Sequence, residues 1–260
     1  MAERSLPILA LEPRNMRHSL LVGSFFFTLF CNAQYRTMEL VRNGGFEDLA
    51  KPVRTYDQLS NATGWTQATL GLAEVFDRGA SAKTIGIPAN DYGNIEPFEG
   101  DHYAGFCGWK ADVQKNWSAD AVDPFTPAWS AYSEYLKGEL VKPLIEDSTY
   151  ELVMHIALSQ NSDRSIMGVG AHLSEFDLKY QHRKFMEESP TVYSEKIIEE
   201  KGKWIEIRDT FVADGKEQFI YLGVFPYVGL QSKNMVEGPD NLYAYYYIDG
   251  ISLMLVPKAP

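Results

Sequence analysis

The sequence predicts an all-β protein, an antiparallel β-sandwich of the jelly-roll kind. In the clearest segments apolar residues recur with a period of two, which is the strand period. Glycine, proline, asparagine and aspartate separate these segments at short intervals, as turns require. Aromatic residues make up 13% of the 260 residues, and aromatic side chains favour strands. No heptad or long helical pattern follows residue 34, so the sandwich is the expected architecture.

The expected strands follow one another along the chain. Residues 150–158 and 203–213 alternate apolar and polar side chains, as half-buried strands do. Residues 217–225 and 243–256 are apolar on both faces, which is typical of central strands. Shorter candidates are residues 38–42, 72–76, 102–106, 132–141 and 167–175. Turns are expected at residues 43–45, 88–91, 99–101, 213–215 and 237–241.

The beginning of the chain has the pattern of a secretory signal peptide. Arg17 and His18 precede an apolar run over residues 20–30, and small or polar residues then lead to Ala33. This run is too short to span a bilayer as a helix. Met16 is then the expected true start, and residues 1–15 are an upstream mis-start. Similarity to bacterial signals that end in NAQ places cleavage after Ala33, so residues 1–33 are removed.

The predicted mature chain is one β-sandwich domain over residues 34–257, and residues 258–260 are a tail or the start of a linker. We expect it to be secreted, to the periplasm, the outer membrane or the cell surface, without a transmembrane span. An alternative is a lipoprotein acylated at Cys31, but Phe30 stands where a small residue is usual. Cys107 is the one cysteine left after cleavage, so stability must come from the core or from metal ions.

Composition and motifs exclude several classes of function. A net charge of −11 argues against a nucleic-acid partner, because phosphate binding needs clustered lysine and arginine. The chain has no G-x-S-x-G, H-E-x-x-H, P-loop or C-x-x-C motif. Paired carboxylates for glycoside hydrolysis stay open as an alternative, because the distance between two acids is not visible in a sequence.

Asp249 is an unusual residue in its surroundings, since it lies in the apolar and aromatic run of residues 241–255. A buried, unpaired carboxylate costs several kcal/mol. Asp249 is therefore expected to accept backbone hydrogen bonds, to pair with a base such as Arg42, or to bind a metal ion.

Two terminal motifs resemble a known family. LVRNGGFE at residues 40–47 and YYIDGISL at residues 246–253 are similar to motifs of carbohydrate-binding-module β-sandwiches with a galactose-binding-like fold. Internal segments such as GWTQATLGLAEVFD and GIPANDYGN resemble a subgroup from secreted and outer-membrane proteins of Bacteroidetes, where such modules often precede an OmpA-like domain. The resemblance covers most of residues 38–256.

The resemblance implies that the first and last strands lie side by side and hold a structural Ca²⁺ between them. The implied ligands are Glu47 and Asp249, and carboxylate oxygens are the ligands that Ca²⁺ prefers. Gly250 departs from the commonest family pattern, which has a second aspartate there, so one ligand is missing. Backbone hydrogen bonds to Asp249, or a pair with Arg42, remain the alternative.

Sugar-binding proteins stack sugar rings on exposed aromatic side chains and bind the hydroxyls with polar groups. The expected loop 108–132 carries tryptophans among polar residues, and residues 225–234 form a second aromatic loop. The predicted ligand-binding residues are Trp109, Trp117, Trp129, Tyr227 and Gln231. For each of these aromatic rings the alternative to ligand binding is a buried, structural position beneath a loop. Trp65 and Trp204 flank strand motifs and are expected in the core.

These observations favour a secreted, non-catalytic carbohydrate-binding module with a structural calcium site, whose partner is a polysaccharide or a cell-envelope glycan. The alternative is an envelope structural or protein-interaction module associated with OmpA-like anchoring, with envelope proteins as partners. A glycan-active hydrolase is the second alternative. A groove lined by aromatic rings would indicate the carbohydrate-binding module, and a broad apolar patch would indicate the interaction module. Two carboxylates across a cleft would indicate the hydrolase.

Overall fold

The structure is a computed structural model that describes residues 38–257 except 82, 116–124, 228 and 238–241. In two strand segments, residues 111–115 and 125–131, it describes the backbone alone. The predicted signal peptide and the tail at 258–260 lie outside the described residues. None of the helices in the described ranges has the length and hydropathy that a membrane-spanning helix needs.

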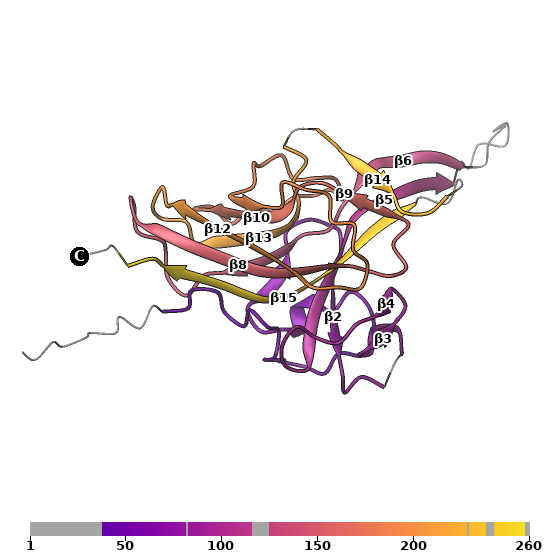
Figure 1. Cartoon of the computed structure of the whole chain (residues 1–260), viewed down its shortest axis with the longest axis horizontal. Helices are drawn as coiled ribbons and strands as arrows, with labels where there is room; N and C mark the ends of the chain where they lie inside the picture. Colours follow the sequence, from indigo (N-terminus) through magenta and orange to yellow (C-terminus); the bar gives the residue numbers. More distant parts are fainter. Residues whose placement is uncertain (1–37, 82, 116–124, 228, 238–241, 258–260) are drawn as a thin grey trace, which may run out of the picture. The chain divides into compact units, whose positions relative to one another are not determined.

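Two antiparallel sheets form the predicted β-sandwich (Figure 1). The five-stranded sheet has the order β1 (Trp65–Gln67), β7 (Leu136–Glu139), β13 (Phe219–Val224), β10 (Val169–Ser174) and β11 (Val192–Tyr193). The six-stranded sheet has the order β12 (Ile205–Val212), β8 (Thr149–Leu158), β15 (Tyr243–Leu255), β5 (His102–Lys115) and β2 (Glu74–Asp77), and β6 (Phe125–Tyr132) pairs with β5.

Two small two-stranded sheets and two short helices complete the described elements. They are β9 (Arg164–Ile166) with β14 (Ser232–Asn234), β3 (Ala89–Asn90) with β4 (Gly93–Asn94), and the 3₁₀ helices η1 (Leu59–Asn61) and η2 (Lys83–Ile85). The hairpin of β3 and β4 matters most for function, because it lies over one face of the six-stranded sheet.

The two ends of the domain lie side by side, as the resemblance implied. The predicted first strand, 38–42, is not a regular strand, but Leu40 donates its N–H to the Leu253 carbonyl of β15 at 3.0 Å. The Glu39 carboxylate accepts the N–H groups of Val41 at 2.9 Å and Leu253 at 2.8 Å. A side chain thus replaces ladder hydrogen bonds that a regular strand would make.

The predicted loop 108–132 is largely a β-hairpin, so this expectation is wrong. Residues up to Lys115 continue β5, and β6 pairs with them from Lys110–Tyr132 to Lys115–Phe125. Register shifts between Lys110 and Val113 interrupt the pairing. Because such bulges break the period of two, the alternation that identifies a strand was not visible in the sequence.

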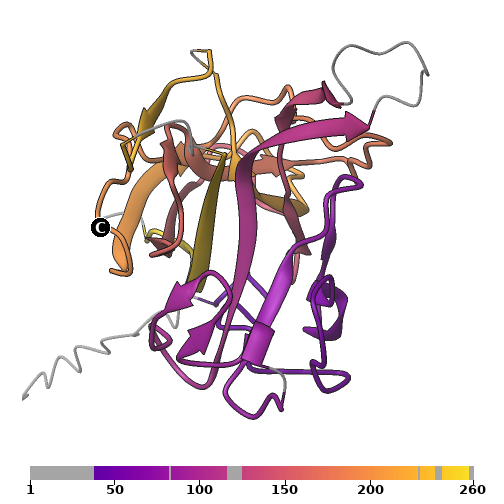
Figure 2. The same cartoon turned by 90° about the vertical axis from the view of Figure 1, so that its right-hand side faces the viewer.

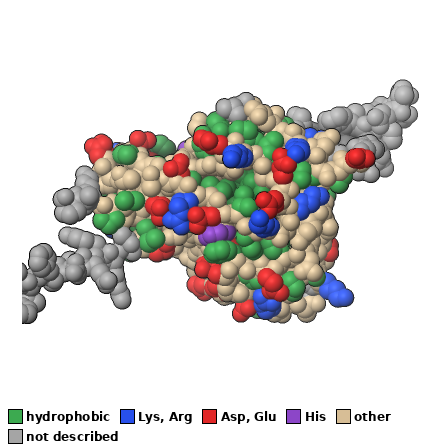
Figure 3. Space-filling view, in the orientation of Figure 1, with side chains coloured by type: hydrophobic (Ala, Val, Ile, Leu, Met, Phe, Trp, Pro, Cys, Tyr) green, Lys and Arg blue, Asp and Glu red, His purple; other side chains and the backbone are tan. Residues whose placement is uncertain are grey.

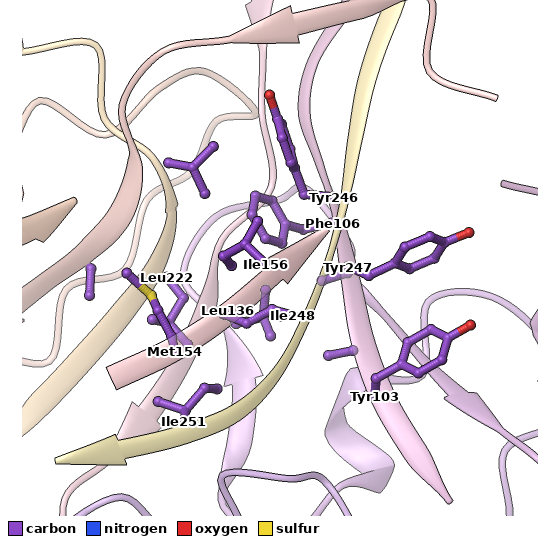
Figure 4. Close-up of a cluster of buried hydrophobic side chains, with 14 of the residues drawn as sticks. Tyr103, Phe106, Leu136, Met154, Ile156, Leu222, Tyr246, Tyr247, Ile248 and Ile251 are labelled. Atoms are coloured by element: carbon purple, nitrogen blue, oxygen red, sulfur yellow. The ribbon is translucent and has the colours of Figure 1, made fainter. Parts of the chain in front are cut away.

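The core lies between the sheets and is centred on β15. Tyr246 and Ile248 of β15 belong to the buried cluster that also contains Met154 and Ile156 of β8 and Leu222 of β13 (Figure 4). The Tyr246 ring stacks on Phe106 at a centroid distance of 5.8 Å. Aromatic pairs of this kind add to the free energy gained by burying their area.

The other face of β15 is also buried, as its apolar sequence predicted. Tyr247 and Tyr103 point away from the sandwich core (Figure 4), and both are fully buried. The segment between β2 and β5, which includes the β3–β4 hairpin, covers them beside the long strand β5 (Figure 2). We call this the outer face of the six-stranded sheet.

We expect Tyr246→Phe to destabilise the domain. The buried Tyr246 hydroxyl accepts the N–H of Ile166 at 2.8 Å, and phenylalanine would leave that donor without a partner. An unsatisfied buried donor costs about 1–3 kcal/mol. Urea denaturation measures the free energy of unfolding. The exposed Tyr227 is the matched control: Tyr227→Phe should change it by less than about 0.5 kcal/mol, and equal effects of both variants would contradict the prediction.

Candidate functional site

A cavity of about 200 Å³ opens on the outer face of the six-stranded sheet, where β15 begins and β6 ends. Four tyrosine rings line it, together with a thiol, an ammonium group and a carboxyl group. The lining residues are Tyr92, Cys107, Lys110, Tyr132, Glu134, Tyr243 and Tyr245. We call this cavity the tyrosine pocket.

A β-bulge decides which residues of β5 face the pocket. Tyr243 and Tyr245 are two apart on β15 and share a face, while their partners on β5, Lys110 and Cys107, are three apart. The register shifts between Ala244 and Tyr245. Without this extra residue Lys110 would face the opposite side from Cys107. The bulge therefore brings Lys110 to the pocket and turns Trp109 away from it.

The tip of the β3–β4 hairpin supplies Tyr92, whose ring stacks on Tyr245 at 3.5 Å with an interplanar angle of 7°. Asn90 fixes this hairpin on the sheet. Its side-chain amide donates to the Tyr103 hydroxyl at 2.9 Å and accepts from the Tyr247 hydroxyl at 2.7 Å. The hairpin that carries Tyr92 is thus fixed by the hydrogen bonds of Asn90 with two buried tyrosines, and this wall of the pocket is preformed.

Gly105 makes room for the Tyr245 ring, on which Tyr92 stacks. A Cβ atom at this position would lie 2.5 Å from the Tyr245 hydroxyl oxygen and 2.8 Å from the Phe76 ring. Because Gly105 has no side chain, the Tyr245 ring can lie flat over β5 and donate its hydroxyl hydrogen to Glu74 of β2. Glu74 is thereby buried directly beneath the tyrosine pocket.

Glu134 lies at the wall of the pocket, between β6 and β7. Its side chain is buried, and it accepts hydrogen bonds from the Tyr132 hydroxyl and the Cys107 N–H, both at 2.6 Å. Both donors are neutral. Among the ion pairs of the described residues, neither Glu134 nor Glu74 has a basic partner.

Burial changes the protonation of this pair. Desolvation raises the pKa of Glu134 to about 7, although the hydrogen bonds from Cys107 and Tyr132 act in the opposite direction. Desolvation also raises the pKa of Glu74 well above its ordinary value, and the nearby charge of Glu134 raises it further. Burial likewise raises the pKa of the Cys107 thiol, so this cysteine is not an activated nucleophile.

Three of the predicted ligand-binding residues, Trp109, Tyr227 and Gln231, do not line the tyrosine pocket. Trp109 is half-buried on the side away from Lys110, and the Arg164 guanidinium lies 4.7 Å from its ring centroid. Trp117 lies outside the described residues, and for Trp129, in β6, only the backbone is described.

The second predicted loop carries Tyr227 and Gln231 at the surface. Tyr227 packs against the Tyr193 ring at a centroid distance of 4.5 Å, and its side chain stays exposed. Gln231 is exposed, and its carbonyl accepts the Met167 N–H at 2.9 Å. Neither residue lines the tyrosine pocket, so any ligand bound by these two residues would lie outside that pocket.

Trp65 is in the core as predicted, while Trp204 is only half-buried against it. Trp65 is 1% exposed and packs on Phe46 at 5.1 Å. Trp204 packs edge-on against Tyr103 at 5.8 Å and donates its ring N–H to the Glu96 carbonyl at 2.8 Å. Trp204 thereby helps to hold the segment that covers the outer face.

Asp249 continues the outer row of β15 beyond Tyr247 and is fully buried. Its Oδ2 accepts the N–H groups of Phe98 at 2.9 Å and Glu99 at 3.1 Å, and its Oδ1 accepts the Gly250 N–H at 2.7 Å. Burial raises the pKa of Asp249 to about 7 despite these bonds. Backbone hydrogen bonding, one of the alternatives left open by the sequence, is therefore present at Asp249.

Glu47 reaches the same covering loop at another place. Its Oε1 accepts the N–H groups of Asp101 and His102 at 2.9 Å, and its Oε2 lies 2.9 Å from His102 Nδ1. The loop of residues 98–102 thus joins Glu47 from the first segment to Asp249 from the last strand. The described residues hold no group of three or more His, Cys, Asp or Glu side chains arranged for a metal ion.

Glu99 is a further acid at this junction that the sequence did not point out. A Cβ atom on Gly45 would lie 2.9 Å from Glu99 Oε1 and 3.7 Å from Asp249 Oδ1, so both carboxyls border the same glycine. Gly250 is at a positive φ of 55° in the bulge after Asp249. A Cβ there would lie 2.8 Å from Phe98, so both the backbone conformation and the space favour glycine at this position.

Sequence reasoning missed the tyrosine pocket, although its residues come from noticeable segments. Tyr243 and Tyr245 belong to YAYYYID, Tyr92 to NDYGN, and Tyr132 and Glu134 to YSEY. A glutamate between two tyrosines, in a segment expected to be a strand, is the same kind of signal that Asp249 gave. That these three segments meet around one cavity is a result of the tertiary structure.

No protein-family model matches the sequence, and no curated protein sequence matches it. Several solved structures have a similar fold. The CBM22-1 xylan-binding domain from Paenibacillus barcinonensis Xyn10C matches at 10% identity and a TM-score of 0.39, over 85% of this chain and 95% of that domain. The K2 cleaved adhesin domain of Lys-gingipain matches at 10% identity and a TM-score of 0.36, over 85% and 98%.

A third similar structure is the C-terminal family 22 carbohydrate-binding module of Clostridium thermocellum Xyn10B. It is 8% identical with a TM-score of 0.38, over 84% of this chain and 98% of the module. At these values the similarity concerns the β-sandwich alone. The site has to be interpreted from its own residues.

The buried acids predict an unusual pH dependence of stability. The pKa of Glu134 is about 7 when folded, above its value near 4.3 in an unfolded chain. The contribution of Glu134 to the free energy of unfolding is therefore complete below about pH 4. It is lost as the pH rises through about 7, at up to about 1.4 kcal/mol per pH unit. We expect the free energy of unfolding to fall over this range by about 3 kcal/mol.

Urea denaturation at a series of pH values checks this. Glu134→Gln keeps an amide acceptor but cannot ionise, so it should make the fall smaller and be more stable than the wild type at high pH, while Glu74 and Asp249, whose pKa values are also raised, keep part of the slope. The exposed Glu175 provides the control, because Glu175→Gln should leave the profile as it is. A wild-type profile that is already flat would show that Glu134 is ionised throughout.

Proposed function

We propose that the protein is a non-catalytic carbohydrate-binding module and that the tyrosine pocket holds one sugar ring. The observation that carries this proposal is the convergence of four tyrosine rings and a few polar groups on one preformed cavity. Pockets with aromatic walls and a small number of placed polar groups are the usual form of a small-ligand site.

The size of the pocket limits its ligand. A volume of about 200 Å³ is below the roughly 300–1,000 Å³ of sites for drug-sized ligands. One pyranose ring fits such a cavity better than several consecutive rings. The proposed ligand is therefore the end of a polysaccharide chain, or a single-residue branch, of an extracellular or cell-envelope glycan.

The pocket also has groups that suit a sugar. The half-buried rings of Tyr132 and Tyr243 offer apolar faces for stacking. Lys110 can donate to hydroxyl oxygens from the rim. The Tyr243 hydroxyl donates to the Asn161 carbonyl at 2.6 Å, so its oxygen is left to accept a hydrogen bond from the ligand.

The two rival functions have less support in the described residues. A glycosidase needs two carboxyls on opposite sides of the scissile bond, whereas Glu134 is the one carboxyl among the residues that line the pocket. An interaction module would present a broad apolar patch. On the face that Figure 3 shows, hydrophobic side chains instead lie in small groups between acidic and basic ones.

The test compares the tyrosine pocket with the predicted aromatic loop. Mature protein is titrated with oligosaccharides of xylose, glucose, galactose and N-acetylglucosamine by calorimetry. We expect Tyr243→Ala to weaken binding of the best ligand by at least about tenfold, or 1.4 kcal/mol, and Tyr227→Ala to leave it unchanged. Thermal melts confirm that both variants fold.

If binding is lost in Tyr227→Ala alone, the sugar binds at the 225–231 loop and not in the tyrosine pocket. Absence of binding across the panel would favour the interaction module that the sequence left open. Release of new reducing ends from any oligosaccharide would show a hydrolase.

We propose further that the mature protein acts outside the cytoplasm and that Ca²⁺ stabilises the junction of its two ends. Asp249 and Glu99 border the same glycine without a basic partner among the described ion pairs, and nearby like charges favour a bound cation. Glu47 and carbonyls of the 43–45 turn would be the other oxygen ligands. Glu47 is engaged by His102, so it would have to exchange that bond for the metal.

Chelation tests the calcium proposal. We expect the melting temperature of the mature protein to be several degrees lower in EDTA than in excess Ca²⁺, because a ligand that binds the folded state stabilises it. Asp249→Asn should remove the difference, and the exposed Asp209→Asn should not. An identical melt in EDTA and Ca²⁺ would rule out the metal and leave the backbone hydrogen bonds of Asp249 as its sole support.

A further inference from the structure

We infer that the tyrosine pocket binds an amine-bearing sugar, with the protonated amine held between the tyrosine rings and Glu134. This inference rests on the proposed function and narrows it, since it names the class of sugar. Three features of the pocket support it: the aromatic walls, the buried acids and the balance of charge.

The walls have the composition of a cation site. Four of the seven lining residues are tyrosines, and the faces of aromatic rings attract ammonium groups when water is excluded. The stacking of Tyr92 on Tyr245 and the anchoring of its hairpin through Asn90 hold two of these rings in place. Binding of the ligand therefore does not have to order this part of the tyrosine pocket.

The two acids are buried without a basic partner in the described ion pairs. Glu134 is 5% exposed and Glu74 is 4% exposed, and the described ion pairs include neither. Both carboxyls are held by neutral donors, namely the Tyr132 and Tyr245 hydroxyls and the Cys107 N–H. Hydrogen bonds of this kind stabilise a buried carboxylate only in part.

Lys110 is the one basic side chain among the lining residues, and it is exposed at the rim. Its single positive charge can balance one ionised carboxyl, so the pocket would carry an excess negative charge only with both Glu134 and Glu74 ionised, and the raised pKa values of the two acids mean that the empty pocket avoids this state by retaining protons. A neutral sugar leaves the carboxyls protonated, whereas an ammonium group lets Glu134 ionise beside it and form an ion pair. The charge balance therefore favours an amine over a hydroxyl at the same position of the sugar ring.

Protonation of the empty pocket gives the inference a second observable. The groups that act on Glu134 are Tyr132, Cys107, Lys110, Glu74 and Asp57, and the buried carboxyls retain protons near neutrality because of desolvation. An ammonium group beside Glu134 favours its ionised form. Binding of the amine should then release a proton from the protein.

Calorimetry on the mature wild-type protein tests this with a matched pair of ligands. The probes are the trisaccharide of β-1,4-linked glucosamine and its fully N-acetylated form, which has the same linkage but no charge. At about pH 7 we expect the amine form to bind at least about tenfold more tightly. Titrations in two buffers of different ionisation enthalpy should show proton release for the amine form alone.

Glu134→Gln identifies the group responsible. It should reduce the preference for the amine form to less than about threefold and abolish the proton release. The exposed Glu175→Gln should keep both. Thermal melts show whether Glu134→Gln is folded, and the wild-type comparison of the two trisaccharides stands without any variant.

The outcomes separate this inference from the proposed function. If neutral oligosaccharides bind as well as the amine form, the amine preference is wrong and the carbohydrate-binding proposal stands. If no oligosaccharide binds, both are wrong. If the preference survives in Glu134→Gln, the amine is bound elsewhere and the assignment to this pocket is overturned.

Discussion

The burial of both faces of β15 is the constraint on which the rest of the structure depends. A strand between two neighbours in one sheet normally has one face on the core and one toward solvent. Here Tyr246 and Ile248 fill the sandwich core, while Tyr245, Tyr247 and Asp249 need a second cover. The segment between β2 and β5 provides that cover, and the tyrosine pocket forms where the cover ends.

Hydroxyl and carboxyl groups enter this second buried layer with the aromatic rings. The tyrosine hydroxyls bond to Glu74 and Asn90, and the Asp249 carboxyl receives backbone N–H groups of the covering loop. Each polar group therefore has a partner, as buried polar groups require. The partners are neutral, however, so the acids keep raised pKa values. This combination of aromatic surface and unbalanced acid distinguishes the pocket from an ordinary core.

The ends of the domain are joined by the same layer. Glu47 follows the first turn and Asp249 belongs to the last strand, and both carboxylates bind N–H groups of residues 98–102. One loop thus connects three distant parts of the chain. A cation beside Asp249 would reinforce this junction, whereas ligand binding in the tyrosine pocket acts at the opposite end of the β15 outer row. The two proposals can therefore be tested independently.

The sequence by itself determined the β-sandwich, the central position of residues 243–256, the burial of Trp65 and the proximity of the two chain ends. The first three follow from apolar periodicity and local motifs, which are properties of neighbouring residues, whereas the proximity of the ends was implied by the resemblance of the two terminal motifs to a known family. Only the tertiary structure decided that Trp109 turns away from the pocket, that residues 110–115 pair with residues 125–132, and that Tyr92, Tyr132 and Tyr245 meet. The physical reason is that bulges shift the register by one residue, which reverses the facing of side chains, and that contacts between distant segments leave no periodic signal in the sequence.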